Sequence, residues 1–486
     1  MENSLAMLGK RRKHYAQPRA RTRSRELSPG LHTVGIAYGK TRLPLELDPA
    51  LADWHVIQPR QEAPMPDPHD AFLQVCRNPS DCLPLREVIQ PSDRVVIVTS
   101  DGTRPVPNQV LLPWLLEELP IPPEQLTVLV GTGTHRPNTP DEIRAMFGLE
   151  VARRVRIVNH DAFSPEQNED LGQTASEMRV LLDKVYTRAD KRIVLGFVEP
   201  HFFAGFSGGA KGVVPGVAGI ETIFDIHGFE LLAHPRSTWG ALDDNPVHQT
   251  ILDAVALCPP EFLVNVTLNR DKAITGLFAG DYRTAHRAAC TKVREAAMVP
   301  VPQEFPIVVT SNSGFPLDQN LYQSVKGMSA AARIVQPGGT IVMASECGDG
   351  IPAHGNFGTV LRENADIEGV EAWLRGLASP VLDQWQIQLL AQILKRAKVA
   401  LHSRLSREVV ESCNLVHLKD FQKGVRDHIE RLGKRPPIAV LPDGPLTLPY
   451  VQCGRVRSRY PAGANPAPVR LASRRVASPW REGSNP

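Results

Sequence analysis

Short apolar runs alternate with helical patterns along most of this chain, and this alternation restricts the fold more than any other feature. The runs at 94–98, 126–130, 154–158 and 192–198 predict buried strands. Helices are predicted between them, at 108–119, at 139–147 and in a Glu/Leu-rich stretch before residue 192. Strands that alternate with helices at this spacing predict a largely parallel, wound sheet.

A second alternation begins at 306–310, after the proline-containing linker 299–302. We therefore expect an α/β fold with two domains, each with a largely parallel, wound sheet, and an active site in the cleft between them. At 486 residues, the chain is long enough for two hydrophobic cores. The expected divisions are an N-terminal domain at 31–300, a C-terminal domain at 301–425, and a return segment at 426–453 that could pack on the N-terminal domain.

The two ends differ in composition from the body. Residues 1–30 and 454–486 are rich in Arg, Pro, Ser, Ala and Gly and are expected to be disordered basic tails, whereas the body between them is acidic. A nucleic-acid domain would carry its positive charge on a folded face, so no specific nucleic-acid partner is expected.

The chain has no apolar run long enough to span a membrane and no secretory signal pattern at its start. Its seven cysteines are odd in number, widely spread and without a Cys-x-x-Cys pair. These features predict a cytoplasmic protein without membrane contact or a zinc ribbon.

The stretch from Glu199 to Gly216 follows the predicted strand 192–198 and surrounds Ser207 and Lys211 with glycines, among them Gly208 and Gly209. Glycine lets backbone amides approach a ligand closely. The stretch therefore predicts a loop that holds a phosphate-bearing molecule, with a flexible surface loop as the plain alternative.

Two common phosphate motifs do not fit. A Walker A loop needs Gly-Lys-Ser/Thr, but Ala210 precedes Lys211 and Gly212 follows it. The stretch Gly131-Thr-Gly133-Thr-His135-Arg136 begins like a dinucleotide-binding fingerprint, but Arg136 replaces the third glycine. The sequence thus argues against an ATPase and gives little support for NAD.

Three further segments hold unusual polar residues. Asp101 and Arg104 follow the strand 94–98, and a guanidinium there can form a fork onto a carboxylate or phosphate. His135 follows the strand 126–130. Gln323 and Lys326 are three residues apart, which places both on one helical face. Each segment alone has an ordinary explanation, as a helix cap, a structural histidine or a solvated face, but together they suggest one cofactor site.

These residues together resemble the nickel-pincer lactate racemase family. The resemblance rests on Ser100-Asp-Gly-Thr-Arg-Pro105, Gly131-Thr-Gly-Thr-His-Arg136, the loop from His201 to Gly216, His227 and Gln323-Ser-Val-Lys326, and it covers about residues 30 to 450. It implies a nickel pincer nucleotide, a pyridinium mononucleotide with two sulfur-bearing arms that binds nickel.

The resemblance also implies roles for individual residues. Lys211 would be joined to the cofactor as a thioamide, and His227 would be a nickel ligand, for which a helix-end histidine is the alternative. Asp101, Gly131, Gly133, Ser207, Gly208 and Gly209 would hold the nucleotide. Trp385 matches a family position near the active site, although a plain core tryptophan is the simpler interpretation.

The implied reaction is racemisation or epimerisation of a 2-hydroxy acid by proton-coupled hydride transfer to the nickel cofactor. His135 and His201 would be the two bases, while Arg104, Gln323 and Lys326 would hold the substrate carboxylate. The implied partners are a small-molecule 2-hydroxy acid, lactate first, and the enzymes that synthesise and load the cofactor. Two alternatives remain open: an epimerase of a larger 2-hydroxy acid or sugar acid, and a non-catalytic protein that binds nickel or the nucleotide.

Overall fold

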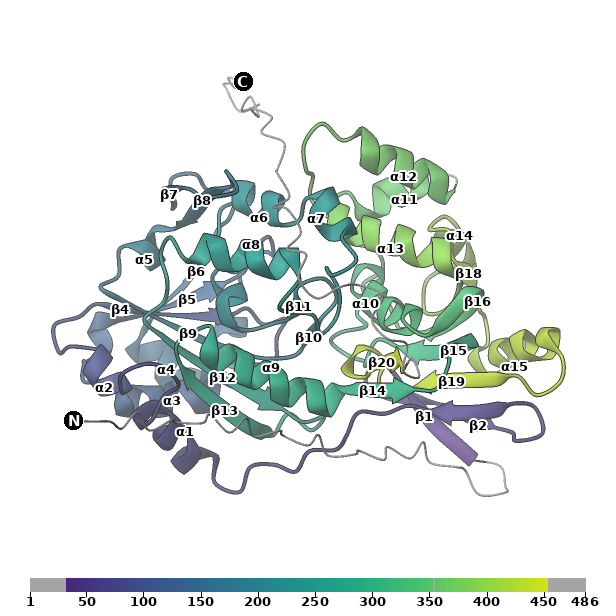
Figure 1. Cartoon of the computed structure of the whole chain (residues 1–486), viewed down its shortest axis with the longest axis horizontal. Coiled ribbons are helices and arrows are strands. Elements are labelled where there is room, and N and C mark those ends of the chain that lie inside the picture. The colour runs from purple at the N-terminus through teal and green to yellow at the C-terminus, as the bar shows by residue number, and fades with distance from the viewer. Residues whose placement is uncertain (1–31, 353–354, 365, 453–486) are drawn as a thin grey trace, which may run out of the picture.

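The computed structural model describes residues 32–352, 355–364 and 366–452. Within these ranges the chain forms two six-stranded sheets, one in each of two domains that lie side by side (Figure 1). The expected two-domain α/β fold with largely parallel sheets is confirmed. The predicted basic tails, 1–30 and 454–486, lie outside the described residues.

The first sheet has the strand order β13-β12-β9-β4-β5-β6, and all its neighbours pair in parallel except β12 and β13. Its strands are β4 (Val95–Ser100), β5 (Leu126–Gly131), β6 (Arg156–Asn159), β9 (Lys191–Phe197), β12 (Phe262–Leu268) and β13 (Ile274–Gly280).

Both faces of the first sheet are covered, which explains why β4 is a continuous apolar run. Val95 and Ile97 pack into one buried cluster with the helix that carries Leu111, whereas Val96 and Val98 pack into a second cluster on the opposite face. The first face is covered by α1 (Pro68–Arg77), α2 (Leu85–Val88), α3 (Asn108–Glu118) and α4 (Pro140–Arg154). The second is covered by α6 (Ile220–Ile226), α8 (Pro246–Val255) and α9 (Thr284–Ala297).

The second sheet is parallel throughout, in the order β18-β17-β16-β15-β19-β3. Its strands are β3 (Asp53–Val56), β15 (Phe305–Ser311), β16 (Val335–Ala344), β17 (Lys398–His402), β18 (Val416–His417) and β19 (Pro437–Leu441). One face packs on α10 (Leu321–Ala332), α11 (Phe357–Glu363), α12 (Ile367–Gly376) and α13 (Gln384–Arg396). The other packs on α15 (Phe421–Leu432) and the hairpin of β1 (His32–Tyr38) and β2 (Thr41–Leu47).

The remaining elements connect these layers. They are β7 (Asn168–Gln173), β8 (Arg179–Asp183), β10 (Pro200–His201), β11 (Gly205–Phe206), β14 (Met298–Val301), β20 (Leu448–Val451), α5 (Lys184–Thr187), α7 (Phe229–Ala233), α14 (Arg407–Glu411), η1 (Pro123–Gln125), η2 (Gly209–Gly212) and η3 (Gly444–Leu446). Strands β14 and β20 pair in parallel, which joins residues from the expected domain junction to the last described segment.

One expectation about local structure is wrong, and one strand was not predicted. The stretch before residue 192, expected to be helical, contains the antiparallel pair β7 and β8, followed only by the four-residue α5. Strand β13, which the sequence interpretation did not identify, extends the first sheet by antiparallel pairing. Both are edge or hairpin elements, whose pairing partners a local pattern does not reveal.

The strand pairings also alter the expected division of the chain. Strand β3 pairs with β19, and the β1–β2 hairpin packs on the second sheet, at the right of Figure 1. Residues 32–56 therefore lie with the second sheet, although we expected them in the N-terminal domain. The expected return segment contains β19, which is itself a strand of the second sheet. We propose domain limits that follow the sheets, with residues 32–57 and 302–452 in the second domain.

The first sheet has its topological switch point between β9 and β4. From β4 the chain continues outward to β5 and β6, whereas from β9 it continues to β12 and β13 on the other side. Ligands of open α/β sheets bind at the carboxyl ends of the strands at such a point. The loops after β4, β5 and β9 all leave the sheet there, and they carry most of the predicted site residues.

Candidate functional site

The glycine loop after β9 is packed tightly against the rest of the first domain. Gly208 has φ of +75°, and a Cβ there would lie 2.8 Å from both Asn265 Oδ1 and Val198 Cγ2. The Gly209 amide donates to Asn265 Oδ1 at 2.9 Å. A Cβ on Gly209, which has φ of +57°, would lie 2.5 Å from the His286 ring, so packing requires glycine at both positions.

The predicted glycines after β5 contact the far end of the same loop. The Gly133 amide donates to the Gly216 carbonyl at 3.0 Å, and a Cβ on Gly131 would come within 3.2 Å of the Gly216 backbone. Gly131 and Gly133 therefore bring the His135 loop and the Lys211 loop together.

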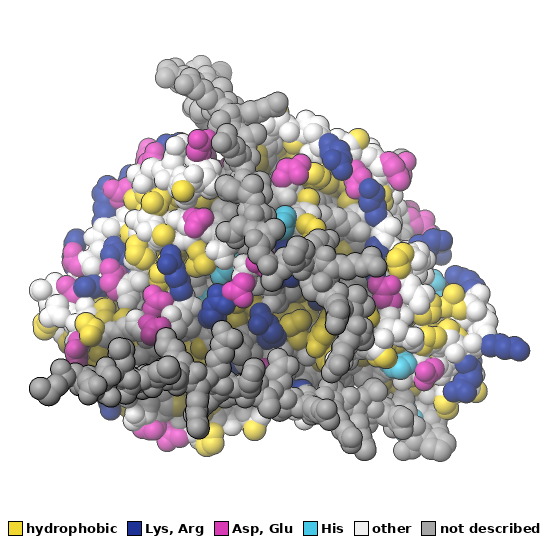
Figure 2. Space-filling view, viewed as in Figure 1, with side chains coloured by type: hydrophobic (Ala, Val, Ile, Leu, Met, Phe, Trp, Pro, Cys, Tyr) yellow, Lys and Arg dark blue, Asp and Glu magenta, His cyan; other side chains and the backbone are white. Residues whose placement is uncertain are grey.

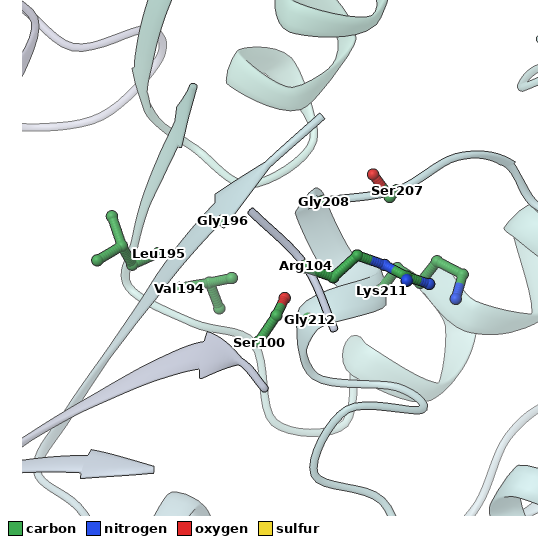
Figure 3. Close-up of a pocket in the computed structure, with 9 residues that line it drawn as sticks. All are labelled: Ser100, Arg104, Val194, Leu195, Gly196, Ser207, Gly208, Lys211 and Gly212. Atoms are coloured by element: carbon green, nitrogen blue, oxygen red, sulfur yellow. The ribbon is translucent and has the colours of Figure 1, made fainter. Parts of the chain in front are cut away.

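A cavity of about 60 Å³ lies between the loops after β4 and β9. Figure 3 shows Arg104 and Lys211 among the residues that line it, together with Ser100, Ser207 and Gly208, and the charge of Arg104 acts on Lys211. Its lining combines two cationic side chains with hydroxyl groups and glycines, which suits a polar or anionic part of a ligand.

Two buried aromatic rings, Phe202 and Phe203, connect the histidines and lysines of the site. The His201 ring stacks on Phe202 with centroids 4.5 Å apart, and Lys326 Nζ lies 5.9 Å from the centroid of the same ring. The Phe203 centroid lies 5.9 Å from Lys211 Nζ and 5.1 Å from the centroid of the His227 ring. Lys211 and His227 therefore lie beside the same phenyl ring, close enough to reach a single ligand.

The two predicted bases differ in their surroundings. His135 Nδ1 lies 2.7 Å from Asp101 Oδ2, and the other Asp101 oxygen accepts from the Thr103 hydroxyl and amide. His201 Nδ1 instead faces the amides of Phe203 and Ala204, at 3.5 and 3.3 Å. A carboxylate at Nδ1 leaves Nε2 free to accept a proton, whereas donors at Nδ1 favour a proton on Nε2.

Charge and burial shift several pKa values in the site. Burial raises the pKa of the Asp101 carboxyl, but the hydrogen bond and charge of His135 outweigh this effect and lower it overall. Burial lowers the pKa of His201 well below its usual value, and the charges of Lys211 and Arg104 lower it further. Neutral histidine is thus strongly favoured at position 201.

Both lysines of the site have lowered pKa values. Burial, followed by the charge of Arg104, lowers the pKa of Lys211 to about 7 and that of Lys326 to about 7. Each lysine therefore has a substantial neutral population at physiological pH. Lys326 Nζ also donates to Gln323 Oε1 at 2.7 Å, so the predicted pair on α10 is in direct contact.

His227 ends helix α6 and has one nitrogen occupied. Its Nδ1 donates to the Ile223 carbonyl at 2.7 Å, which leaves the lone pair on Nε2. Burial lowers the pKa of His227 to about 3, so the ring is neutral, as a metal ligand must be. Among the described residues, no group of three or more His, Cys, Asp or Glu side chains could hold a metal ion by itself. A metal here would need donors from a bound ligand.

The second domain closes the site with α10 and α13. The Trp385 ring lies 4.5 Å from the His227 ring, and its Nε1 donates to the Tyr322 hydroxyl at 2.7 Å. Trp385 is also part of the large buried cluster of the first domain, so it has the core position of the simpler interpretation, and its active-site role stays a prediction. Figure 2 shows acidic and basic side chains interspersed over the visible face of both domains.

Glu199 is a site residue that the sequence interpretation did not single out. Its Oε1 lies 3.5 Å from Arg104 Nε, and its charge raises the pKa values of Lys211 and Lys326 against the effect of burial. The sequence feature that could have identified Glu199 as a site residue is its position directly after the predicted buried strand, two residues before His201.

Comparison with known proteins identifies the family of this chain. Residues 38–240 match the family model "Lactate racemase N-terminal domain" and residues 302–447 match "Lactate racemase C-terminal domain". The chain belongs to the lactate racemase family. It is accordingly assigned to the isomerases.

Two curated lactate racemases are similar over most of their length. The protein of Thermoanaerobacterium thermosaccharolyticum is 34% identical to this chain, over an alignment that covers 85% of this chain and 97% of the relative. That of Lactiplantibacillus plantarum is 36% identical, covering 76% and 87% respectively.

Solved structures agree on the fold. The lactate racemase apoprotein from T. thermosaccharolyticum superposes with a TM-score of 0.80 at 32% identity, covering 86% of this chain and all of that one. A Thermotoga maritima protein, at 17% identity with a TM-score of 0.61 and coverage of 80% of this chain and all of that one, shares the fold alone. None of the described helices is long and apolar enough to cross a membrane.

Proposed function

We propose that this member of the lactate racemase family inverts the C2 centre of a small 2-hydroxy acid, lactate first, with a nickel pincer nucleotide joined to Lys211. The observation that carries the proposal is that Lys211 and His227 both lie beside the Phe203 ring, with two differently tuned histidines nearby.

The residues present fit such a cofactor. The lowered pKa of Lys211 provides the neutral amine that forming a thioamide requires. His227 offers an imidazole lone pair on Nε2, a donor that suits nickel alongside sulfur. Ser207 and Gly208 line the cavity beside Lys211, where they could hold a polar part of the nucleotide. When bound, the cofactor would supply a centre that accepts hydride from C2 and returns it.

The protein side chains would bind the acid and move its hydroxyl proton. Arg104 and Lys326 give the site positive charge for the substrate carboxylate, and Gln323 orients Lys326. His135 Nε2 would accept the hydroxyl proton, since Asp101 holds Nδ1 and compensates the charge that develops on the ring.

His201 would act on the other face of the substrate. With the Phe203 and Ala204 amides directed at Nδ1, its neutral form carries the proton on Nε2. Acting as a base at Nε2 therefore requires the proton to move to Nδ1 and these two weak contacts to break. Both histidines are required because the two enantiomers present their hydroxyl groups to different sides of the site.

The proposal also includes how the cofactor is loaded and in which compartment the protein works. Enzymes that synthesise the cofactor would have to load it. The six cysteines within the described residues are unpaired, which supports a reducing, cytoplasmic compartment.

A chiral assay of protein produced together with the cofactor-synthesis enzymes, run against lactate and larger 2-hydroxy acids, tests the reaction. Inversion of lactate is expected, and inversion only of a larger acid or sugar acid would support the epimerase alternative. Intact mass tests the attachment: the wild-type protein should be heavier than its apo form, and Lys211→Ala should abolish the difference. A wild-type protein without added mass would contradict the proposal.

A further inference from the structure

The first five residues of α13 include three glutamines, Gln384, Gln386 and Gln388, each at most 2% exposed. An amide buried without a hydrogen-bond partner destabilises a protein, so buried glutamines need an explanation. Two of the three bond across the boundary between the domains, one to the proposed nickel ligand His227 and one to Phe229, two residues later.

Gln384 and Gln388 are four residues apart, which places them on one face of α13. Gln384 Nε2 donates to the His227 carbonyl at 3.1 Å, and Gln388 Nε2 donates to the Phe229 carbonyl at 2.9 Å. Gln386 lies on another face, and its Nε2 donates to the Tyr322 carbonyl of the second domain itself. The three side chains thus separate into two that cross between domains and one that does not.

Gln384 is fixed at both ends of its amide. Its Oε1 accepts from the Val381 amide at 3.0 Å, so the NH₂ group is the end directed at His227. The neighbouring Trp385 ring contacts the His227 ring at 4.5 Å. The same helical turn therefore contacts this histidine at both its backbone and its ring.

His227 depends on such contacts because it ends the seven-residue helix α6. Carbonyl groups at a helix end have no partner within the helix, and Gln384 supplies one. The first domain contributes the Nδ1 bond to Ile223 and the Phe203 ring. The position of Nε2 is consequently set by side chains of both domains.

We propose that Gln384 and Gln388 are positioning residues that hold the His227 segment against the second domain, so that nickel retention depends on contact between the domains. This inference rests on the proposed function, in which His227 is the nickel ligand.

The test measures nickel release from cofactor-loaded protein challenged with a chelator. Gln384→Met and Gln388→Met each remove the one donor that crosses between the domains while keeping a similar side-chain length, and Gln384→Met also removes the bond from the Val381 amide. Each variant should release nickel roughly 2- to 10-fold faster, as expected for the loss of the one neutral hydrogen bond across the boundary. Gln386→Met, equally buried but bonded within its own domain, is the matched control and should stay within about twofold of wild type by the same reasoning. Equal rates for all three variants, or no change in the first two, would overturn the proposal.

Two further measurements complete the design. His227→Ala separates the two levels of inference: if it retains nickel like wild type, the ligand assignment itself falls, whereas a loss there with no effect of the glutamine variants removes only this proposal. In wild-type protein, cofactor loading should slow amide hydrogen exchange in both 223–233 and 384–392. Protection confined to the first segment would count against the coupling even if the variants did not fold.

Discussion

Asp101→Asn tests the proposed pairing of Asp101 with His135. The change keeps the shape of the side chain but removes its charge, and the amide can present a donor to His135 Nδ1. His135 then loses both its fixed orientation and the compensation of its developing charge. We expect kcat to fall, with a smaller effect on KM, because the carboxylate-binding residues Arg104 and Lys326 are untouched.

The size of the effect follows from the geometry. A hydrogen bond to a charged group contributes about 1.5–3 kcal/mol, and the lower end applies because solvent reaches this pair. The His135 side chain is 42% exposed, although Asp101 is buried. About 1.5 kcal/mol corresponds to roughly a tenfold loss of kcat.

The assay is chiral analysis of lactate conversion from each enantiomer. Since enantiomers have equal free energy, kcat/KM must fall equally in both directions, which checks the data internally. Thr103→Ala is the control, because it removes a partner of Asp101 Oδ1 but leaves the Oδ2 contact with His135, and it should have a smaller effect. The tautomer of His135, measured by ¹⁵N NMR in the apo protein, should change in Asp101→Asn. A variant with unchanged kcat and an unchanged tautomer would refute the pairing.

Two other predictions concern charge and packing. Lys326, with its pKa lowered to about 7, is a cation below that pH and loses its charge above it, so kcat/KM should fall as pH rises through about 7. Lys326→Met should lower kcat/KM at acidic pH and remove this decrease with pH. A decrease that persists in the variant would contradict the assignment. Gly208→Ala and Gly338→Ala both place a Cβ at positive φ, but only the first meets atoms at 2.8 Å, since no described atom lies within 4 Å of the second. In urea unfolding, Gly208→Ala should therefore cost about 1–3 kcal/mol more than Gly338→Ala, and equal costs would show that the loop relaxes freely.

The proposed site indicates how substrate choice could arise. Phe202 and Phe203 are buried and occupied by contacts with His201, Lys211, Lys326 and His227. Their first effect is therefore to fix these charged and ligating groups. Any preference for an apolar substrate tail would depend on space beside the rings rather than on the rings alone.

Much of the fold follows from the sequence because its strands are buried on both faces. The apolar run of β4 and its neighbours indicated a wound α/β sheet, and the polar residues directly after β4, β5 and β9 indicated where a ligand would bind. The inference about the sheet is confirmed, and the ligand site stays a prediction that follows from it, because parallel strands share one carboxyl edge and local position along the chain determines place on the sheet.

Other features were decided only by tertiary structure. Strand β3 lies beside β19, nearly four hundred residues later, and no local pattern in Asp53–Val56 identifies that partner. The bond from Asp101 to His135, the placement of Glu199 beside Arg104 and the contact of Gln384 with His227 join separate segments in the same way. The sequence alone determined which residues stand at the ends of the strands, since that depends on neighbouring residues; which of them pair, and how their protons and charges are set, depends on packing between elements distant in the chain.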